Sequence, residues 1–158
     1  CLVGSEMCIR DSSLLLLLML AVSASAAAVK MTVGVRFWRE SGDKESMADS
    51  AVDTTRGATL TRQPNGTFTL ELPVKQLSSM NMTGRLTGIA IGEVNYDGTL
   101  SGDLSDGTAV LTLKNLPASV LTGSDSNKAL AVTCSIKMDT ILLGDISTSA
   151  KMSIWVER

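Results

Sequence analysis

Histidine is absent from this sequence. It is the side chain whose ordinary pKa lies nearest neutrality, and it serves as the usual general base and as a common metal ligand. Its absence excludes Ser-His-Asp and Cys-His catalysis, and it excludes histidine ligation of zinc or iron. The acidic residues Asp97, Asp103 and Asp106 do not follow a calcium-loop spacing, and we expect them to be solvated among turns. The sequence therefore predicts neither an enzyme nor a metal centre.

Cysteine and net charge are also scarce. Of three cysteines, Cys1 and Cys8 lie near the start, which leaves Cys134 alone in the rest of the chain. We expect Cys134 to be packed rather than reactive, because it falls on the apolar face of an alternating segment. The chain carries a net charge of −2, and leaving out Glu6, Arg10 and Asp11 gives −1 for the remainder. Such a balance argues against nucleic-acid binding, which needs a basic surface.

The first 26 residues read as two segments that do not belong to the folded domain. Residues 1–12 resemble a translated sequencing adapter, and we exclude them as an artefact. The apolar run Leu14–Val22 and the small residues Ala24-Ser25-Ala26 are typical of a signal peptide over residues 13–26. A membrane helix is disfavoured because it needs about 20 apolar residues. We thus expect one secreted or cell-surface domain over residues 27–158, which meets the membrane only through the signal peptide before cleavage.

Strict apolar–polar alternation dominates this domain. Alternation with a period of two predicts strands with one buried face, and Asn65-Gly66 between two such runs predicts a hairpin. Gly88 and Gly92 predict that the strand at 85–93 is weakened or bulged, and residues 75–84 are expected to form a loop. Ser46 is a suitable cap for one short helical turn. Seven or eight short strands without a long helix indicate a β-sandwich or barrel; the clearest strands cover 29–37, 57–62, 66–74, 85–93, 108–114, 130–138 and 151–157.

Several motifs occur in an order that resembles one known family. The opening segment Val33–Ala48 (VGVRFWRESGDKESMA) is followed by a hairpin, by the Met82–Leu86 stretch (MTGRL) and by a closing strand at 151–157. In this order they are similar to the NEAT (near iron transporter) domain, a haem-uptake module of Gram-positive cell surfaces. The resemblance covers nearly all of residues 27–158, although each motif alone is degenerate. It implies an all-β, immunoglobulin-like antiparallel sandwich of 7–8 strands with one short helical turn near the N-terminus.

The resemblance also shows where this chain departs from the family. Haem-binding members hold the iron through a Tyr-x-x-x-Tyr motif in the hairpin of the last two strands. The corresponding segment here is Ile146–Ala150 (ISTSA), which has no tyrosine, and the single tyrosine is Tyr96 in a turn signal. The sequence therefore indicates a divergent member that lacks the motif.

Four residues remain as candidates for cofactor binding: Ser46, Met47, Met138 and Met152. In the family, a serine at the position of Ser46 can bind a haem propionate, and its apolar neighbour covers the porphyrin. A thioether can also serve as an axial haem ligand. For Ser46 and Met47, a purely structural role as cap and packing residue is an equal alternative. Met138 and Met152 lie on apolar strand faces, where methionine usually fills gaps.

Two functions follow as hypotheses. The first is an exported cell-surface binding module of NEAT type that binds haem or a related tetrapyrrole in iron acquisition, with haem or a haem-carrying protein as its partner. The second is a protein-recognition or adhesion module that keeps the fold but does not bind haem. An exposed aromatic patch around Trp38 or Trp155 would favour the second.

Overall fold

A computed structural model of the chain describes residues 27–79, 81–140 and 144–158. The adapter-like segment and the signal peptide lie outside these residues. Within the described part, no helix is both long and apolar enough to cross a membrane. The elements are β1 (Val29–Arg39), η1 (Met47–Ala51), β2 (Ala58–Arg62), β3 (Phe68–Pro73), β4 (Leu77–Ser79), β5 (Met82–Ile91), β6 (Val94–Asp97), β7 (Thr99–Ser101), β8 (Val110–Leu116), η2 (Ala118–Val120), η3 (Ser126–Lys128), β9 (Leu130–Met138) and β10 (Asp145–Val156).

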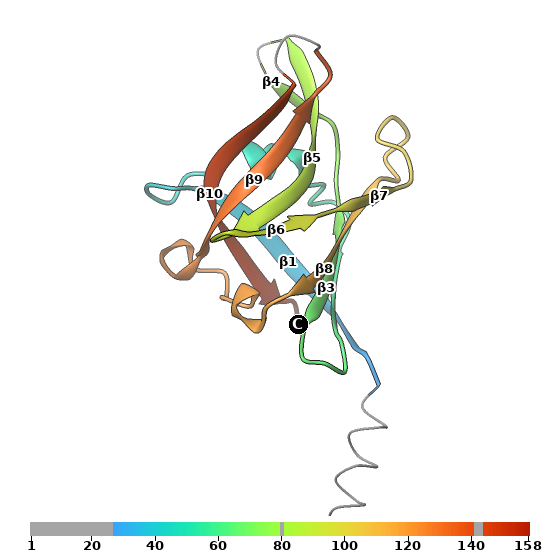
Figure 1. The fold of residues 1–158 in the computed structure, drawn as a ribbon, viewed down its shortest axis with the longest axis vertical. Coiled ribbons are helices and arrows are strands. Elements are labelled where there is room, and N and C mark those ends of the chain that lie inside the picture. Colours follow the sequence, from blue (N-terminus) through green and yellow to red (C-terminus); the bar gives the residue numbers. More distant parts are fainter. Residues whose placement is uncertain (1–26, 80, 141–143) are drawn as a thin grey trace, which may run out of the picture.

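The strands form an antiparallel sandwich in which β1 belongs to both layers (Figure 1). Its first half pairs with β2, from Val29 opposite Arg62 to Val33 opposite Ala58. Its second half pairs with β10, as far as Arg39 opposite Ala150. One layer therefore reads β4-β5-β9-β10-β1 and the other β1-β2-β3-β8-β7, with β6 added to β5. This architecture confirms the expected all-β, immunoglobulin-like sandwich.

Three short strands extend the expected set of seven or eight. The strands β4, β6 and β7 have three or four residues each, and an alternation of apolar and polar residues cannot be recognised over so short a segment. The expectation of a loop at residues 75–84 is wrong, because β4 pairs there with the start of β5. The cause is local: Leu77 is buried, and Asn81 adopts a φ of 63° that suits a tight turn.

Two local signals in the sequence are confirmed. The hairpin between β2 and β3 turns at Asn65 and Gly66, where the Asn65 side chain accepts a hydrogen bond from the Thr67 N–H at 3.0 Å and Gly66 has a φ of 85°. Glycine suits that backbone conformation because it has no side chain. In β5 the pairing with β9 shifts register between Leu86 and Gly88, which is the predicted bulge.

The core lies between the two layers and is built from the inward faces of the alternating strands. Its largest fully buried side chains come from both layers, and each stabilises the fold by roughly 1.5–3 kcal/mol relative to an exposed position. Cys134 lies among them, as predicted, and burial raises the pKa of its thiol to about 12. These large side chains are Phe37, Leu60, Leu70, Leu72, Leu77, Leu86, Ile89, Leu111, Leu113, Leu116, Ile136 and Met152.

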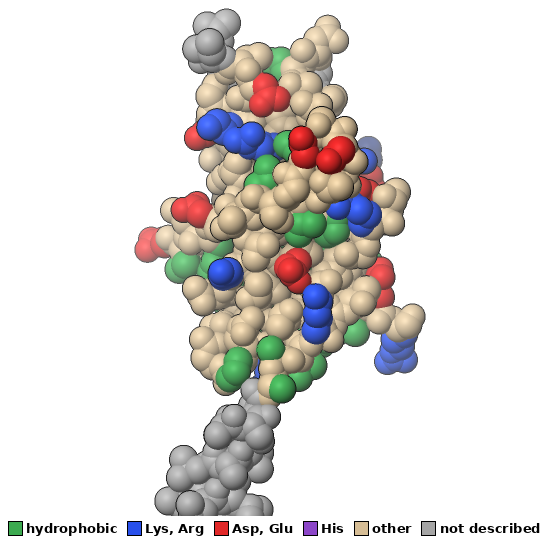
Figure 2. Space-filling model, turned by 90° about the vertical axis from the view of Figure 1, so that its right-hand side faces the viewer, with side chains coloured by type: hydrophobic (Ala, Val, Ile, Leu, Met, Phe, Trp, Pro, Cys, Tyr) green, Lys and Arg blue, Asp and Glu red, His purple; other side chains and the backbone are tan. Residues whose placement is uncertain are grey.

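The surface carries charges of both signs. On the face shown in Figure 2, acidic and basic side chains are interspersed, and neither sign gathers into a stripe. This distribution agrees with the small net charge of the sequence. The face in view therefore offers no continuous basic track for a phosphate backbone.

Candidate functional site

The turn η1 forms a lip that is fixed to β1 by two hydrogen bonds. The Ser46 N–H donates to the carbonyl of Phe37 at 2.9 Å, and the Phe37 N–H donates to Oδ1 of Asp49 at 2.8 Å. The Ser46 hydroxyl accepts from the Ala48 N–H at 3.3 Å, which is the predicted cap. Between these anchored residues, the Met47 side chain is 39% exposed. The lip thus presents one apolar side chain on a firmly held turn.

Asp49 is a buried carboxylic acid within this lip. Burial raises the pKa of its carboxyl group above the ordinary value of 3.8, because desolvation of the charged form outweighs the hydrogen bond from the Phe37 N–H. Among the described residues, the same carboxylate provides the only acceptor for the buried Phe37 N–H. Holding the lip in place therefore requires a polar acceptor in a position that is unfavourable for charge.

The lip spans one layer of the sandwich. It contacts β1 and β4, the two outer strands of the layer β4-β5-β9-β10-β1, and it also contacts β5. The Lys75 N–H donates to the Ala51 carbonyl at 2.9 Å and so joins the end of η1 to the approach to β4. Because η1 contacts both outer strands, the layer must curl beneath it. The strands β5, β9 and β10 lie between these two outer strands, and their inner faces, which belong to the core, are called the floor.

The Met-Thr-Gly motif of β5 fixes the β9–β10 hairpin beside this floor. The Thr83 hydroxyl donates to Asp139 at 2.7 Å, and the Asp139 N–H donates to the Thr83 carbonyl at 2.9 Å. Gly84 pairs with Met138, and a Cβ at Gly84 would lie 2.8 Å from the Met138 sulfur. Any larger residue at this position would therefore clash with the Met138 side chain. The motif that carries part of the resemblance is explained by these contacts.

The segment that corresponds to the tyrosine motif lies on β10. Ile146, Thr148 and Ala150 alternate with exposed serines, pair with the buried β9 residues Ile136, Cys134 and Val132, and so face the floor. Ile146 is half-buried against the core and Ala150 is 2% exposed. The inward side chains at the two ends of this segment, Ile146 and Ala150, are thus apolar.

Tyr96 does not replace that motif. It lies in β6 and pairs with Ile89, near the opposite end of β5 from Gly84. It is half-buried and packs against the core. Tyr96 therefore lies in a strand, and not in the turn that the sequence signal indicates.

The structure separates the four candidate residues into different settings. Ser46 and Met47 lie together on the lip, and Met138 is 7% exposed at the end of β9 near the hairpin. Met152 is fully buried in the core opposite Phe37, so its sulfur can reach a ligand only if the core rearranges.

Sequence reasoning did not single out Asp49 and Asp139, which hold the lip and the hairpin. Asp49, three residues after the capping serine, could have been noticed as an acidic residue in the first helical turn. Asp139 gave no such signal, because its partner Thr83 is 56 residues away in the sequence.

The strand order, the lip after β1 and the closing β9–β10 hairpin define a domain with the NEAT fold. A solved structure of the NEAT5 domain of IsdX2, a B. anthracis hemophore in complex with haem, superposes with a TM-score of 0.52 at 12% identity, over 84% of this chain and 99% of that one. A mutant of the same domain in complex with haem gives a TM-score of 0.51 at 12% identity, over 84% and 98%. No family model and no curated protein sequence matches the chain. The resemblance seen in the sequence is therefore confirmed at the level of the fold.

Proposed function

We propose that this chain is an exported, cell-surface binding module of NEAT type that carries a haem-like tetrapyrrole. The observation that carries the proposal is the fold shared with a NEAT5 domain and its mutant, both solved in complex with haem, together with an anchored lip that exposes Met47. An exposed apolar side chain on a firmly held turn suits contact with a flat, apolar ligand. The signal-peptide pattern of residues 13–26 supports export to the cell surface, where the module would meet haem or a haem-carrying protein.

We further propose that the tetrapyrrole is held by apolar contact rather than by a bond to iron. The chain has no histidine, and its one tyrosine lies away from the lip. Among the candidate thioethers, Met152 is fully buried and Met138 nearly so, which leaves Met47 as the accessible sulfur. In this arrangement Met47 covers the ring and Met138 lies at the wall. The Ser46 hydroxyl, which caps η1 and is 6% exposed, reaches a propionate only if η1 shifts.

The test is a paired titration with haem and with metal-free protoporphyrin IX, followed by absorbance and by quenching of tryptophan fluorescence. Without an iron ligand, the two compounds should bind with affinities within about threefold, since a tenfold difference already corresponds to about 1.4 kcal/mol. Replacing Met47→Ala should weaken both to the same degree, whereas Met47→Leu should leave both nearly unchanged because the two side chains have similar volumes. Met31→Leu, on the other half of β1, is the matched control.

Each outcome of this titration decides something. Tighter binding of haem that is lost in Met47→Leu would show that the Met47 sulfur ligates iron and would overturn binding by contact alone. No binding of either compound would overturn the carrier function. The second hypothesis, a protein-recognition module, would then remain, and it is favoured by Trp38 and Trp155, which are both half-exposed on the outer face of the β1–β10 pair.

A further inference from the structure

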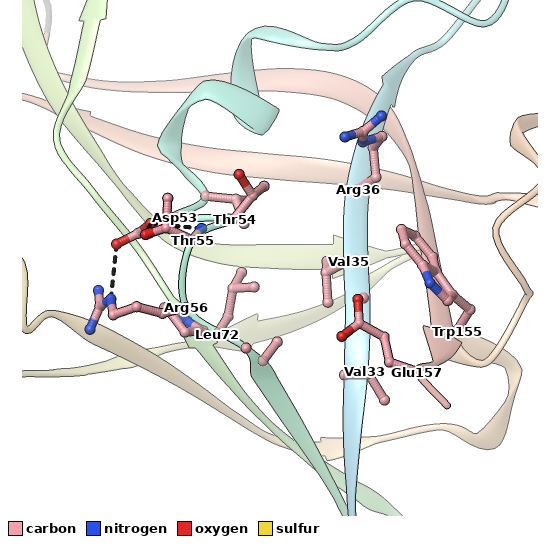
Figure 3. A pocket seen from close by; sticks show the side chains of 15 residues that line it. Val33, Val35, Arg36, Asp53, Thr54, Thr55, Arg56, Leu72, Trp155 and Glu157 are labelled. Carbon is pink, nitrogen blue, oxygen red and sulfur yellow. Dashed lines mark hydrogen bonds and ion pairs between the residues drawn. The ribbon is translucent and has the colours of Figure 1, made fainter.

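A pocket of about 320 Å³ lies beside β1, the strand that both layers share, at the point where its pairing with β2 ends (Figure 3). The segment from Asp53 to Gly57 forms one side of it, and Trp155 and Glu157 at the end of β10 form the other. Its volume lies at the lower end of the range for small-molecule sites, so it suits one residue-sized ligand. None of the tetrapyrrole candidates lines it, so a ligand bound here would be independent of the proposed function.

The backbone of β1 is open at this pocket. The last pair between β1 and β2 joins Val33 to Ala58. Opposite Val35 on β10, Ile154 uses its N–H and C=O towards the segment 122–123 and not towards β1. Because strand groups alternate between the two neighbours, Val35 directs its own N–H and C=O away from β10 and into the gap. Within the described residues neither group has a hydrogen-bond partner, which leaves one donor and one acceptor free for a ligand.

The wall formed by residues 53–57 is held by several hydrogen bonds, and its two charged side chains, Asp53 and Arg56, pair with each other. Arg56 donates to Asp53 at 2.9 Å, to the Val74 carbonyl at 3.2 Å and to the Ala109 carbonyl at 2.7 Å. The Thr55 hydroxyl and then the Arg56 guanidinium hold the pKa of Asp53 below its ordinary value. This wall therefore positions the ligand but contributes no net charge.

Four charged side chains line the pocket, and within the described residues Glu157 alone among them has no ion-pair partner. Arg36 lines its upper end, but its guanidinium points away and pairs with Glu45 at 3.3 Å (Figure 3). Glu157 makes no ion pair within the described residues, and its side chain points across the pocket (Figure 3). An uncommitted carboxylate at the mouth of a pocket attracts a cation.

An indole ring lies beside this carboxylate. The Trp155 ring covers Gly34 so closely that a Cβ there would be 2.3 Å from its Cε2 atom. Aromatic faces attract ammonium and guanidinium groups, most strongly in the case of tryptophan. Gly34 pairs with Trp155 and precedes Val35 on β1, so the indole ring and the open backbone groups lie at adjacent positions of the strand.

We propose that this pocket binds a basic amino-acid residue, lysine or arginine, with its cation against Glu157 and Trp155 and its amide group against Val35. The ligand class follows from the two features together: a cation alone would leave the Val35 groups unpaired, and a neutral amide would leave Glu157 unpaired. The residue can be free or part of a partner's chain, and capped and uncapped lysine probes separate these two sources.

The experiment is a titration followed by two-dimensional NMR of the Val35 amide and the Trp155 indole N–H. N-acetyl-lysine methylamide should shift both signals, and N-acetyl-norleucine methylamide, which lacks only the charge, should bind roughly tenfold more weakly. Butylamine should shift the indole signal alone. If free lysine binds as well as the capped compound, the source is the free amino acid; if only the capped compound binds, the source is a peptide.

Variants make the assignment specific. Glu157→Gln should weaken the lysine probe about threefold, because it removes one of the two contacts of the cation at an exposed position, and it should leave the norleucine probe unchanged. Glu71→Gln, a surface carboxylate paired with Lys30, should change neither. Both variants should keep the melting temperature and the amide spectrum of the parent, which checks the fold independently of any ligand. The proposal is overturned if the lysine probe leaves both signals in place, if norleucine binds equally well, or if a neutral methyl glucoside produces the same shifts.

Discussion

Replacing Asp49 tests whether one buried carboxylate holds the lip. In Asp49→Ala the Phe37 N–H loses its acceptor inside the protein, and a buried donor without a partner costs about 1–3 kcal/mol. We expect the free energy of unfolding to fall by about 2 kcal/mol, and the melting temperature by roughly 8 °C for a domain of this size. Denaturation in guanidinium chloride measures the first quantity and calorimetry the second.

Asp49→Asn separates the hydrogen bond from the charge. The asparagine oxygen can still accept from Phe37, while the desolvated negative charge is gone, so this variant should be at least as stable as the parent at pH 7. The pKa of Asp49 is raised in the folded protein, so the parent gains stability, relative to the asparagine variant, as pH falls through that raised value. The advantage of Asp49→Asn should therefore be greatest at neutral pH and vanish near pH 3.

Two results would refute this reasoning. One is an Asp49→Ala variant whose unfolding free energy lies within about 0.5 kcal/mol of the parent, the range expected for an ordinary surface substitution. The other is an Asp49→Asn variant as unstable as the alanine variant at pH 7. Asp43→Ala, at an exposed position in the preceding loop, provides the matched control and should have no measurable effect.

Three other sites give predictions that stability or labelling assays can check. Cys134, fully buried with a pKa of about 12, should resist iodoacetamide at pH 8 in the folded protein and react on unfolding, as mass spectrometry would show. Gly34→Ala should lower the unfolding free energy by about 1–3 kcal/mol because the new methyl group meets Trp155, whereas Gly57→Ala, with only one contact at 3.5 Å, should be neutral. Asp53→Asn should be destabilised relative to the parent at pH 7, and denaturation curves should converge as pH falls through the lowered pKa of Asp53.

The fold could be predicted from the sequence because most of its strands are long and have one buried face. In β9 the alternation of apolar and polar residues matches the burial of the side chains closely. In β1 the apolar residues from Met31 to Phe37 are buried or half-buried as expected, whereas Val29 at the start of the strand is 55% exposed. The Asn65-Gly66 turn is a local signal and needs no tertiary context. The short strand β4 was missed, because three residues cannot show a period and its pairing depends on a partner strand.

The site was only partly within reach of the sequence. Ser46 was predicted as a cap because capping is local, and the structure confirms the bond. Met138 and Met152 look equivalent in the sequence, since both lie on apolar strand faces. The structure distinguishes them by burial: Met152 is fully buried, whereas Met138 lies near the hairpin and is 7% exposed. The pocket next to Val35 left no trace in the sequence at all. It exists because β1 changes partners from β2 to β10, and that change is a property of the topology.

A gain of function at β10 gives the sharpest test of how this domain differs from its structural neighbours. Ile146 faces the floor and is half-buried, so a ring fits there with less crowding than at Ala150, where overpacking would cost about 1–3 kcal/mol. If the tetrapyrrole lies where we propose, Ile146→Tyr offers a phenolate to iron, and haem should bind more tightly than protoporphyrin by on the order of tenfold, or about 1.4 kcal/mol. Ile146→Phe adds the same ring without the oxygen and should leave the two affinities equal. A preference for haem in both variants, or in neither, would mean that the iron does not lie above β10 and that the ligand sits elsewhere on the lip.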